Sequence, residues 1–187
     1  MKFVLLALFV AVASANLKHE HTGQWRMVSL ASNNIEKIQE NGELRGFLRD
    51  ISCEGVDCDS VSLNFWMKNN EQCEKFSLVG NKAEGSEDYN TDFSGHNFFR
   101  FCHQSENLLV ICIQNTDVNG LVTHLVDAAA AKLHKDSLEY ECVRSFRVRP
   151  GHKFNEADRK VYRQLVKQQG IDKENIVNVE SADTCPH

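Results

Sequence analysis

The feature that most constrains the fold is a series of short alternating segments between Gln24 and about Ala129. In residues 61–68 (VSLNFWMK), Val, Leu, Phe and Met alternate with Ser, Asn, Trp and Lys. A period of two with turn signals such as Asn41-Gly42 is typical of antiparallel strands and not of an α/β fold. Eight such segments in a meander predict an all-β, eight-stranded, antiparallel up-and-down barrel, which has no edges and leaves room for one small ligand.

The expected strands follow one another with hairpin-length connections, and a helix follows the last of them. The strands are residues 24–32, 42–52, 61–68, 74–82, 89–93, 97–102, 108–115 and 121–129. Asn155 is a helix cap, Glu156 and Asp158 suit the positive end of the helix dipole, and Gly170 provides a left-handed stop. We therefore expect one C-terminal α-helix packed on the barrel.

The N-terminus has the pattern of a secretory signal peptide. Lys2 is followed by an apolar run and then by Ala13-Ser14-Ala15, which predicts cleavage after Ala15 and a mature domain of residues 16–187. The apolar run is shorter than the ~20 residues of a membrane-spanning helix. The formal net charge is −5 with acids and bases interleaved, so we expect neither nucleic acid nor a membrane span, and a secreted protein.

Seven cysteines fit an oxidising compartment, where an odd number leaves at least one unpaired. The Cys53-x4-Cys58 spacing differs from the paired C-x2-C arms of a zinc ribbon. His19-Glu20-His21 offers metal-ligand residue types, but its place near the terminus favours a solvated arm. We expect no metal and no cofactor.

Longer motifs indicate a family. Gly23-x-Trp25 stands at the first strand, and the segments at 29–51, 69–73, 80–82, 170–176 and 182–187 (ADTCPH) accompany it. Together they resemble the odorant- and pheromone-binding branch of the lipocalins. The resemblance implies that Gly23 lets the backbone bend into the barrel and that Trp25 plugs its closed end. It also implies the disulfides Cys73–Cys185 and Cys53–Cys58.

The inward face of each strand is the expected ligand site. Alternation and the family register agree on nine residues there. These are Leu44, Leu48, Leu63, Phe65, Leu78, Thr91, Phe93, Phe99 and Leu125. Residues 108–115 are apolar on both faces, so alternation leaves Leu109/Ile111 and Val110/Cys112 open; the resemblance favours Val110 and Cys112 as inward-facing.

This lining favours small volatile hydrophobic ligands, with Thr91 or a trapped water orienting a carbonyl or hydroxyl group. The resemblance implies a secreted carrier of odorants or pheromones and not an enzyme. One alternative is a protein signal that acts directly on an olfactory or vomeronasal receptor. Another is an enzyme using Cys112 as a cavity thiol, although no basic partner for that thiol is evident. Monomer and dimer both remain open.

Residues 131–153 make the link between the last strand and the helix about twenty residues longer than such barrels normally have. A ninth strand there would need a free edge, and we expect a closed barrel to have none. Three interpretations remain: a disordered loop, an intermolecular contact through Cys142, or an atypical splice or gene-model product. The few large apolar residues favour the loop.

Overall fold

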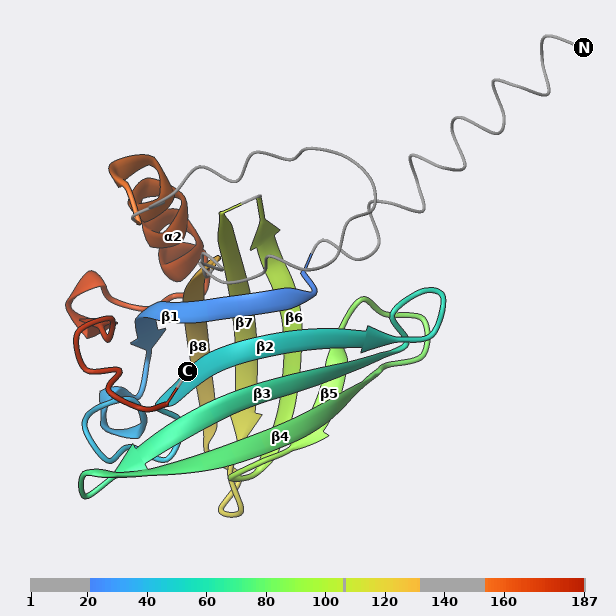
Figure 1. Ribbon diagram of the computed structural model, residues 1–187, viewed down its shortest axis with the longest axis horizontal. Helices are drawn as coiled ribbons and strands as arrows, with labels where there is room; N and C mark the ends of the chain where they lie inside the picture. The colour runs from blue at the N-terminus through green and yellow to red at the C-terminus, as the bar shows by residue number, and fades with distance from the viewer. Residues whose placement is uncertain (1–20, 106, 132–153, 187) are drawn as a thin grey trace, which may run out of the picture.

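The computed structural model describes residues 21–105, 107–131 and 154–186, and its body is a β-barrel with one helix on its outside (Figure 1). The strands of the barrel follow chain order around the ring. They are β1 (Gly23–Ser32), β2 (Gly46–Glu54), β3 (Ser60–Asn69), β4 (Gln72–Lys82), β5 (Tyr89–Asp92), β6 (His96–Gln104), β7 (Leu108–Thr116) and β8 (Val122–Ala131). Every pairing between them is antiparallel.

Strand β1 closes the barrel because it pairs on both sides. Gly23 and Gln24 pair with Ile51 and Asp50 of β2, while residues 25–32 pair with β8. A register shift between Met27 and Ser29 marks an irregularity of the β-bulge type within β1. The predicted eight-stranded antiparallel barrel with one helix is confirmed.

A ninth strand, β9 (Ile176–Asn178), extends the sheet beyond the ring. It pairs with Ser29, Leu30 and Ala31 of β1. The expectation that a closed barrel has no free edge is therefore wrong. Because β1 pairs with β2 at only two residues, the rest of that side of β1 is left for β9.

Helix α2 (Glu156–Gln168) lies against the outside of β8 and β7 (Figure 1). Asn155 accepts a hydrogen bond from the Asp158 backbone, and the Asp158 side chain accepts one from the Asn155 backbone, which forms a capping box. Gly170 follows the helix with φ +70°. Two short 3-10 helices, η1 (Ile35–Lys37) and η2 (Lys173–Asn175), lie in the loops. Among the residues that the structure describes, no helix has both the length and the apolar character needed to span a membrane.

The hydrophobic core fills the end of the barrel at which β1 begins. Trp25 is 4% exposed and packs in one cluster with Ile51, Tyr89 and Phe99, and its indole nitrogen donates to the His21 carbonyl at 2.9 Å. Gly23 has φ +123°, a conformation that side chains disfavour. Gly23 and Trp25, to which the family resemblance gives structural roles, thus lie at the filled end of the barrel.

Three disulfides join six of the cysteines. The predicted pairs Cys53–Cys58 and Cys73–Cys185 are confirmed, and a third bond links Cys102 to Cys112. The seventh cysteine, Cys142, lies outside the described residues, as do the signal sequence 1–15 and residues 132–153 of the long link.

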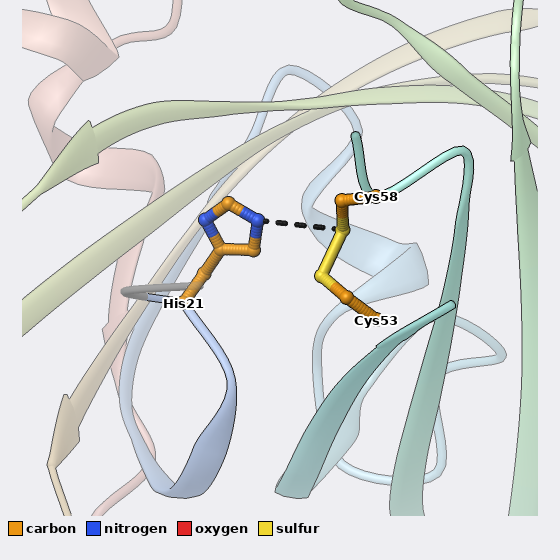
Figure 2. Close-up of side chains that lie close together, drawn as sticks. All are labelled: His21, Cys53 and Cys58. Carbon is orange, nitrogen blue, oxygen red and sulfur yellow. Dashed lines mark hydrogen bonds between the residues drawn. A yellow bond between two sulfur atoms is a disulfide. The ribbon is translucent and has the colours of Figure 1, made fainter. Parts of the chain in front are cut away.

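His21 is anchored to the barrel and is not part of a free arm, as Figure 2 shows. Its ring stacks on Phe101 with centroids 4.2 Å apart, and Nδ1 lies 3.0 Å from Gln104 Oε1. Nε2 lies 3.6 Å from the Cys58 sulfur. With Cys53 and Cys58 joined as a disulfide, these three residues do not offer the thiolates that a metal site of this composition needs. His19 and Glu20 fall outside the described residues.

Candidate ligand-binding cavity

The barrel holds an internal cavity of about 110 Å³ between its filled end and the loop that carries η1. Its wall is formed by inward-facing side chains from most strands and is almost wholly apolar. The lining residues are Met27, Leu44, Gly46, Leu48, Leu63, Phe65, Leu78, Thr91, Phe93, Asn97, Phe99, Ile111, Ile113, Leu125 and Asp127. The cavity therefore suits an apolar molecule, with a few polar atoms to orient it.

Nine predicted residues, from Leu44 to Leu125, lie in this wall, but the assignment of Val110 and Cys112 to it is wrong. Val110 is fully buried on the opposite face of β7, where it packs in the cluster formed with Tyr162 and Val166 of α2. Cys112 lies on the same outer face, bonded to Cys102. Helix α2 gives the outer face of β7 an apolar partner, so both faces of this strand are hydrophobic for different reasons.

Aromatic rings narrow the cavity from one side. Phe65 and Phe76 are stacked with centroids 5.6 Å apart, and Phe93 meets both edge-on at 5.4 Å. Elsewhere in the wall, Gly80 makes room for Phe99, because a Cβ at Gly80 would lie 2.5 Å from the Phe99 ring. The width of the cavity on this side is therefore set by phenylalanine rings.

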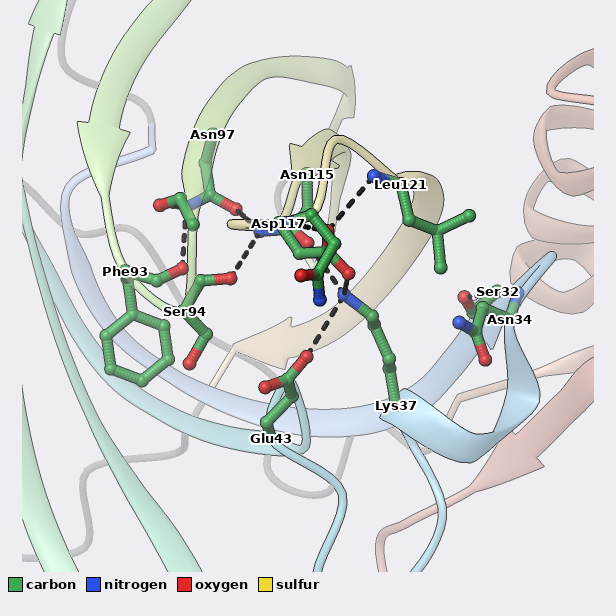
Figure 3. A network of polar contacts seen from close by, with 12 residues as sticks. Ser32, Asn34, Lys37, Glu43, Phe93, Ser94, Asn97, Asn115, Asp117 and Leu121 are labelled. Carbon is green, nitrogen blue, oxygen red and sulfur yellow. Dashed lines mark hydrogen bonds and ion pairs between the residues drawn. The ribbon is translucent and has the colours of Figure 1, made fainter.

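A polar cluster lies at the η1 end of the barrel, as Figure 3 shows. Lys37 is only 8% exposed. Its ammonium group lies 3.2 Å from Asn115 Oδ1, 3.4 Å from Asp117 Oδ2 and 3.0 Å from Glu43 Oε1. Two hydrogen bonds and the ion pair with Glu43 thus offset the cost of burying the charge. The backbone N–H of Leu121 also donates to Asp117 and lowers the pKa of its carboxyl group. This cluster ties the loop before β2 to the β7–β8 hairpin.

Asn97 is the wall residue that joins this cluster. Its amide nitrogen donates to backbone carbonyls, the shortest contact being 2.8 Å to Phe93, and its amide oxygen accepts from Asn115 Nδ2 at 3.0 Å. Both ends of the Asn97 side chain are therefore engaged within the protein (Figure 3).

Asp127 is an acid in the middle of the apolar wall. Its residue is 9% exposed, and burial raises the pKa of its carboxyl group to about 7. The buried Oδ1 atom has no hydrogen-bond partner among the described atoms. A buried acceptor in this state is costly to the folded protein.

Comparison with known proteins identifies the family. Residues 22–139 match the Lipocalin / cytosolic fatty-acid binding protein family. The chain belongs to the lipocalin family. It is 35% identical to Lipocalin Cav p 2.0101 of Cavia porcellus over 189 residues, covering all of this chain and 99% of that protein.

Solved structures of lipocalins share the fold. The crystal structure of aphrodisin, described as a sex pheromone from female hamster, superposes with a TM-score of 0.76 at 27% identity. That comparison covers 90% of this chain and all of aphrodisin. A complex of bovine odorant-binding protein with undecanal has a TM-score of 0.57 at 26% identity, covering 90% of this chain and 94% of that one.

In this lipocalin, Cys112 does not offer a reactive thiol. The enzyme alternative required a free thiolate facing the cavity. Cys112 is instead disulfide-bonded on the outer face of β7. The residue on which that alternative depended thus lies away from the cavity.

Sequence reasoning missed six wall residues, and the signal for most of them was present. They are Met27, Gly46, Asn97, Ile111, Ile113 and Asp127. In β8, alternation from the inward-facing Leu125 places Asp127 on the same face. In β7, alternation allowed Ile111 and Ile113 equally with Val110 and Cys112, because every residue from 108 to 113 is apolar or cysteine.

Proposed function

We propose that this lipocalin is a secreted carrier that binds small hydrophobic molecules, odorants or pheromones among them, inside its barrel. The observation that carries the proposal is the cavity in the barrel, whose wall is apolar except for Thr91, Asn97 and Asp127. Burial of apolar ligand surface supplies the binding free energy, at roughly 25 cal/mol per Å². Three disulfides support an extracellular location.

The size of the cavity supports small ligands. At about 110 Å³ it is near the size of an engineered cavity of roughly 150 Å³ that binds benzene. Larger ligands require movement of the rings of Phe65 and Phe93. Apolar walls distinguish similar shapes poorly, so we expect a broad range of ligands.

Displacement of a fluorescent apolar probe by short-chain volatile compounds tests the proposal. Two adjacent residues of β4 give a matched pair of variants, since Leu78 lines the cavity while Val79 is 50% exposed on the other face. Leu78→Trp should fill the cavity and weaken probe binding about tenfold or more, and Val79→Trp should leave it unchanged. A folded, delipidated protein that binds no probe and none of the volatiles would contradict the carrier proposal.

Aphrodisin favours a second candidate function, because its structure is described as that of a sex pheromone. On this alternative the protein itself is the signal read by an olfactory or vomeronasal receptor. Ligand-stripped protein with its fold intact separates the two functions. A receptor response that survives stripping favours the protein signal, and a response restored only by adding back the ligand favours the carrier.

A further inference from the structure

Asp127 brings a carboxyl group with an unused acceptor to the wall of the cavity. It stands on β8 opposite Ile111 of β7 and Leu30 of β1, neither of which offers a side-chain hydrogen bond. The residue lines the cavity, is about nine-tenths buried, and leaves Oδ1 without a partner. Oδ1 itself is buried, so a turn of the carboxyl group about χ2 brings an oxygen to a ligand inside the cavity, which is the natural partner for this group.

Among the described residues that line the cavity, Asp127 is the one with an ionisable side chain. Residues 108–116 of β7 carry no ionisable side chain except Cys112, which is in a disulfide. On β1, Arg26 pairs with Ala130 and donates to the Glu180 carbonyl at 3.1 Å. On α2, burial first and the charge of Asp127 second raise the pKa of Tyr162 well above 10, so Tyr162 stays neutral below pH 9.

The protonation state of Asp127 decides which ligand groups it can bind. A neutral carboxyl group donates one hydrogen bond and accepts others, whereas a carboxylate only accepts. A hydroxyl group on a ligand can accept from the first and donate to the second. A ketone oxygen can only accept, so it pairs with the neutral form and faces an unpaired charge in the ionised form.

We propose that Asp127 makes the cavity selective for small apolar alcohols over ketones of the same carbon skeleton, and that this selectivity grows as the pH rises. The inference rests on the proposed carrier function and names the ligand class that its cavity prefers. Because the pKa of Asp127 is about 7, the change falls between about pH 5.5 and pH 8.5.

Competition by hexan-2-ol and hexan-2-one against the fluorescent apolar probe tests this at the two ends of that pH range. The two ligands differ by two hydrogen atoms and are close in size. For the wild-type protein, the ratio of the ketone Kd to the alcohol Kd should rise about tenfold from the lower to the higher pH, as expected for a hydrogen bond to a charged group.

Asp127→Asn is the matched variant, because an amide both donates and accepts but does not ionise. Its Kd ratio should be the same at both pH values. Thr91→Val removes a wall hydroxyl group that does not ionise in this pH range, so the Kd values can change but their ratio should keep the wild-type pH dependence. If Asp127→Asn does not fold, the ionisation of Asp127 can be followed in the wild-type protein by carbon-13 NMR. Ketone binding should then raise the Asp127 pKa, and alcohol binding should not.

The outcomes separate the two proposals. If the probe and both ligands bind but the Kd ratio stays constant with pH, or changes equally in Asp127→Asn, the role of Asp127 is overturned and the carrier function stands. If neither the probe nor the ligands bind to folded wild-type protein, the carrier function itself fails.

Discussion

The two faces of β7 are made of the same kinds of residue, but one lines the cavity and the other packs against helix α2. Leu109, Ile111 and Ile113 face the interior of the barrel, where part of the wall borders open space. Leu108 and Val110 face outward, where Tyr162 and Val166 of α2 cover them. Hydrophobicity therefore does not distinguish a binding surface from a packing surface in this protein; the atoms on the other side do.

This difference has an energetic consequence. A side chain packed on all sides gains many dispersion contacts, whereas one that borders a void lacks contacts on that side. The outer face of β7 should thus contribute mainly to the stability of the fold. The inner face should contribute less to stability and more to ligand binding, because a ligand supplies the missing contacts.

The largest expected effect follows from removing the partner of the outer face. Tyr162 is 2% exposed, so Tyr162→Ala should lower the free energy of unfolding by about 3–5 kcal/mol, as for other buried aromatic side chains. Urea titration measures this, and probe affinity in the folded protein should stay within a few-fold of wild type. Tyr162→Phe keeps the ring but loses the hydrogen bond to Ser29, so it should cost about 1 kcal/mol. A loss of affinity as large as that caused by Leu78→Trp would show that the two faces are not independent.

Asp127 supplies a second large effect, this time on the inner face and dependent on pH. Burial raises the pKa of Asp127 to about 7 in the folded protein, against about 3.9 for an unfolded chain. Between these values the unfolded chain loses its proton while the folded protein keeps it. Stability therefore falls as the pH rises from about 4 to 7, by an amount of order 4 kcal/mol, and then levels off.

Asp127→Asn should remove this decline. Urea titrations at about pH 4.5 and pH 8 should show a smaller drop in stability for the variant than for the wild-type protein, and the variant should be the more stable of the two at pH 8. Equal slopes in both proteins would mean that Asp127 is ionised at neutral pH and finds a partner in solution.

The difference between the faces also explains what could be predicted from the sequence. Strands such as β3, with Leu63 and Phe65 on one face and Ser62 and Asn64 on the other, have one apolar face, and alternation orients them correctly. Strand β7 has two, so alternation could not choose, and the family register favoured the wrong one. The orientation of β7 depends on where α2 packs, which is information that lies more than forty residues away in the chain.

Two other features depended on geometry that the sequence did not reveal. The Cys102–Cys112 disulfide forms across the β6–β7 pair, next to a register shift between Phe101 and His103 that alternation alone does not predict. Strand β9 could be recognised as strand-like from residues 176–179, but its partner could not. Pairing with β1 required knowing that β2 leaves β1 after two residues.

The smallest expected effect is also the sharpest comparison of a cavity wall with a packed core. Ile111 and Ile171 are each 4% exposed, but Ile111 lines the cavity while Ile171 packs in the α2 cluster. Ile→Val deletes the same methylene group at both sites. At Ile171 it should cost about 0.5–1.5 kcal/mol, the usual range for a packed core. At Ile111 it should cost less than about 0.5 kcal/mol, because part of that side chain already borders open space.

Paired urea titrations measure the two costs, and probe binding supplies the opposite contrast. Ile111→Val enlarges the cavity, so it should shift affinity slightly toward bulkier ligands, whereas Ile171→Val should leave affinities unchanged. Equal stability costs at the two sites would mean that the space beside Ile111 is filled in solution, either by inward rotation of Phe65 and Phe93 or by a ligand retained from expression. Repeating the titration after delipidation separates these two cases. If a retained ligand filled the space, delipidation removes it and the cost at Ile111 falls below that at Ile171. If the rings of Phe65 and Phe93 fill the space, the two costs stay equal.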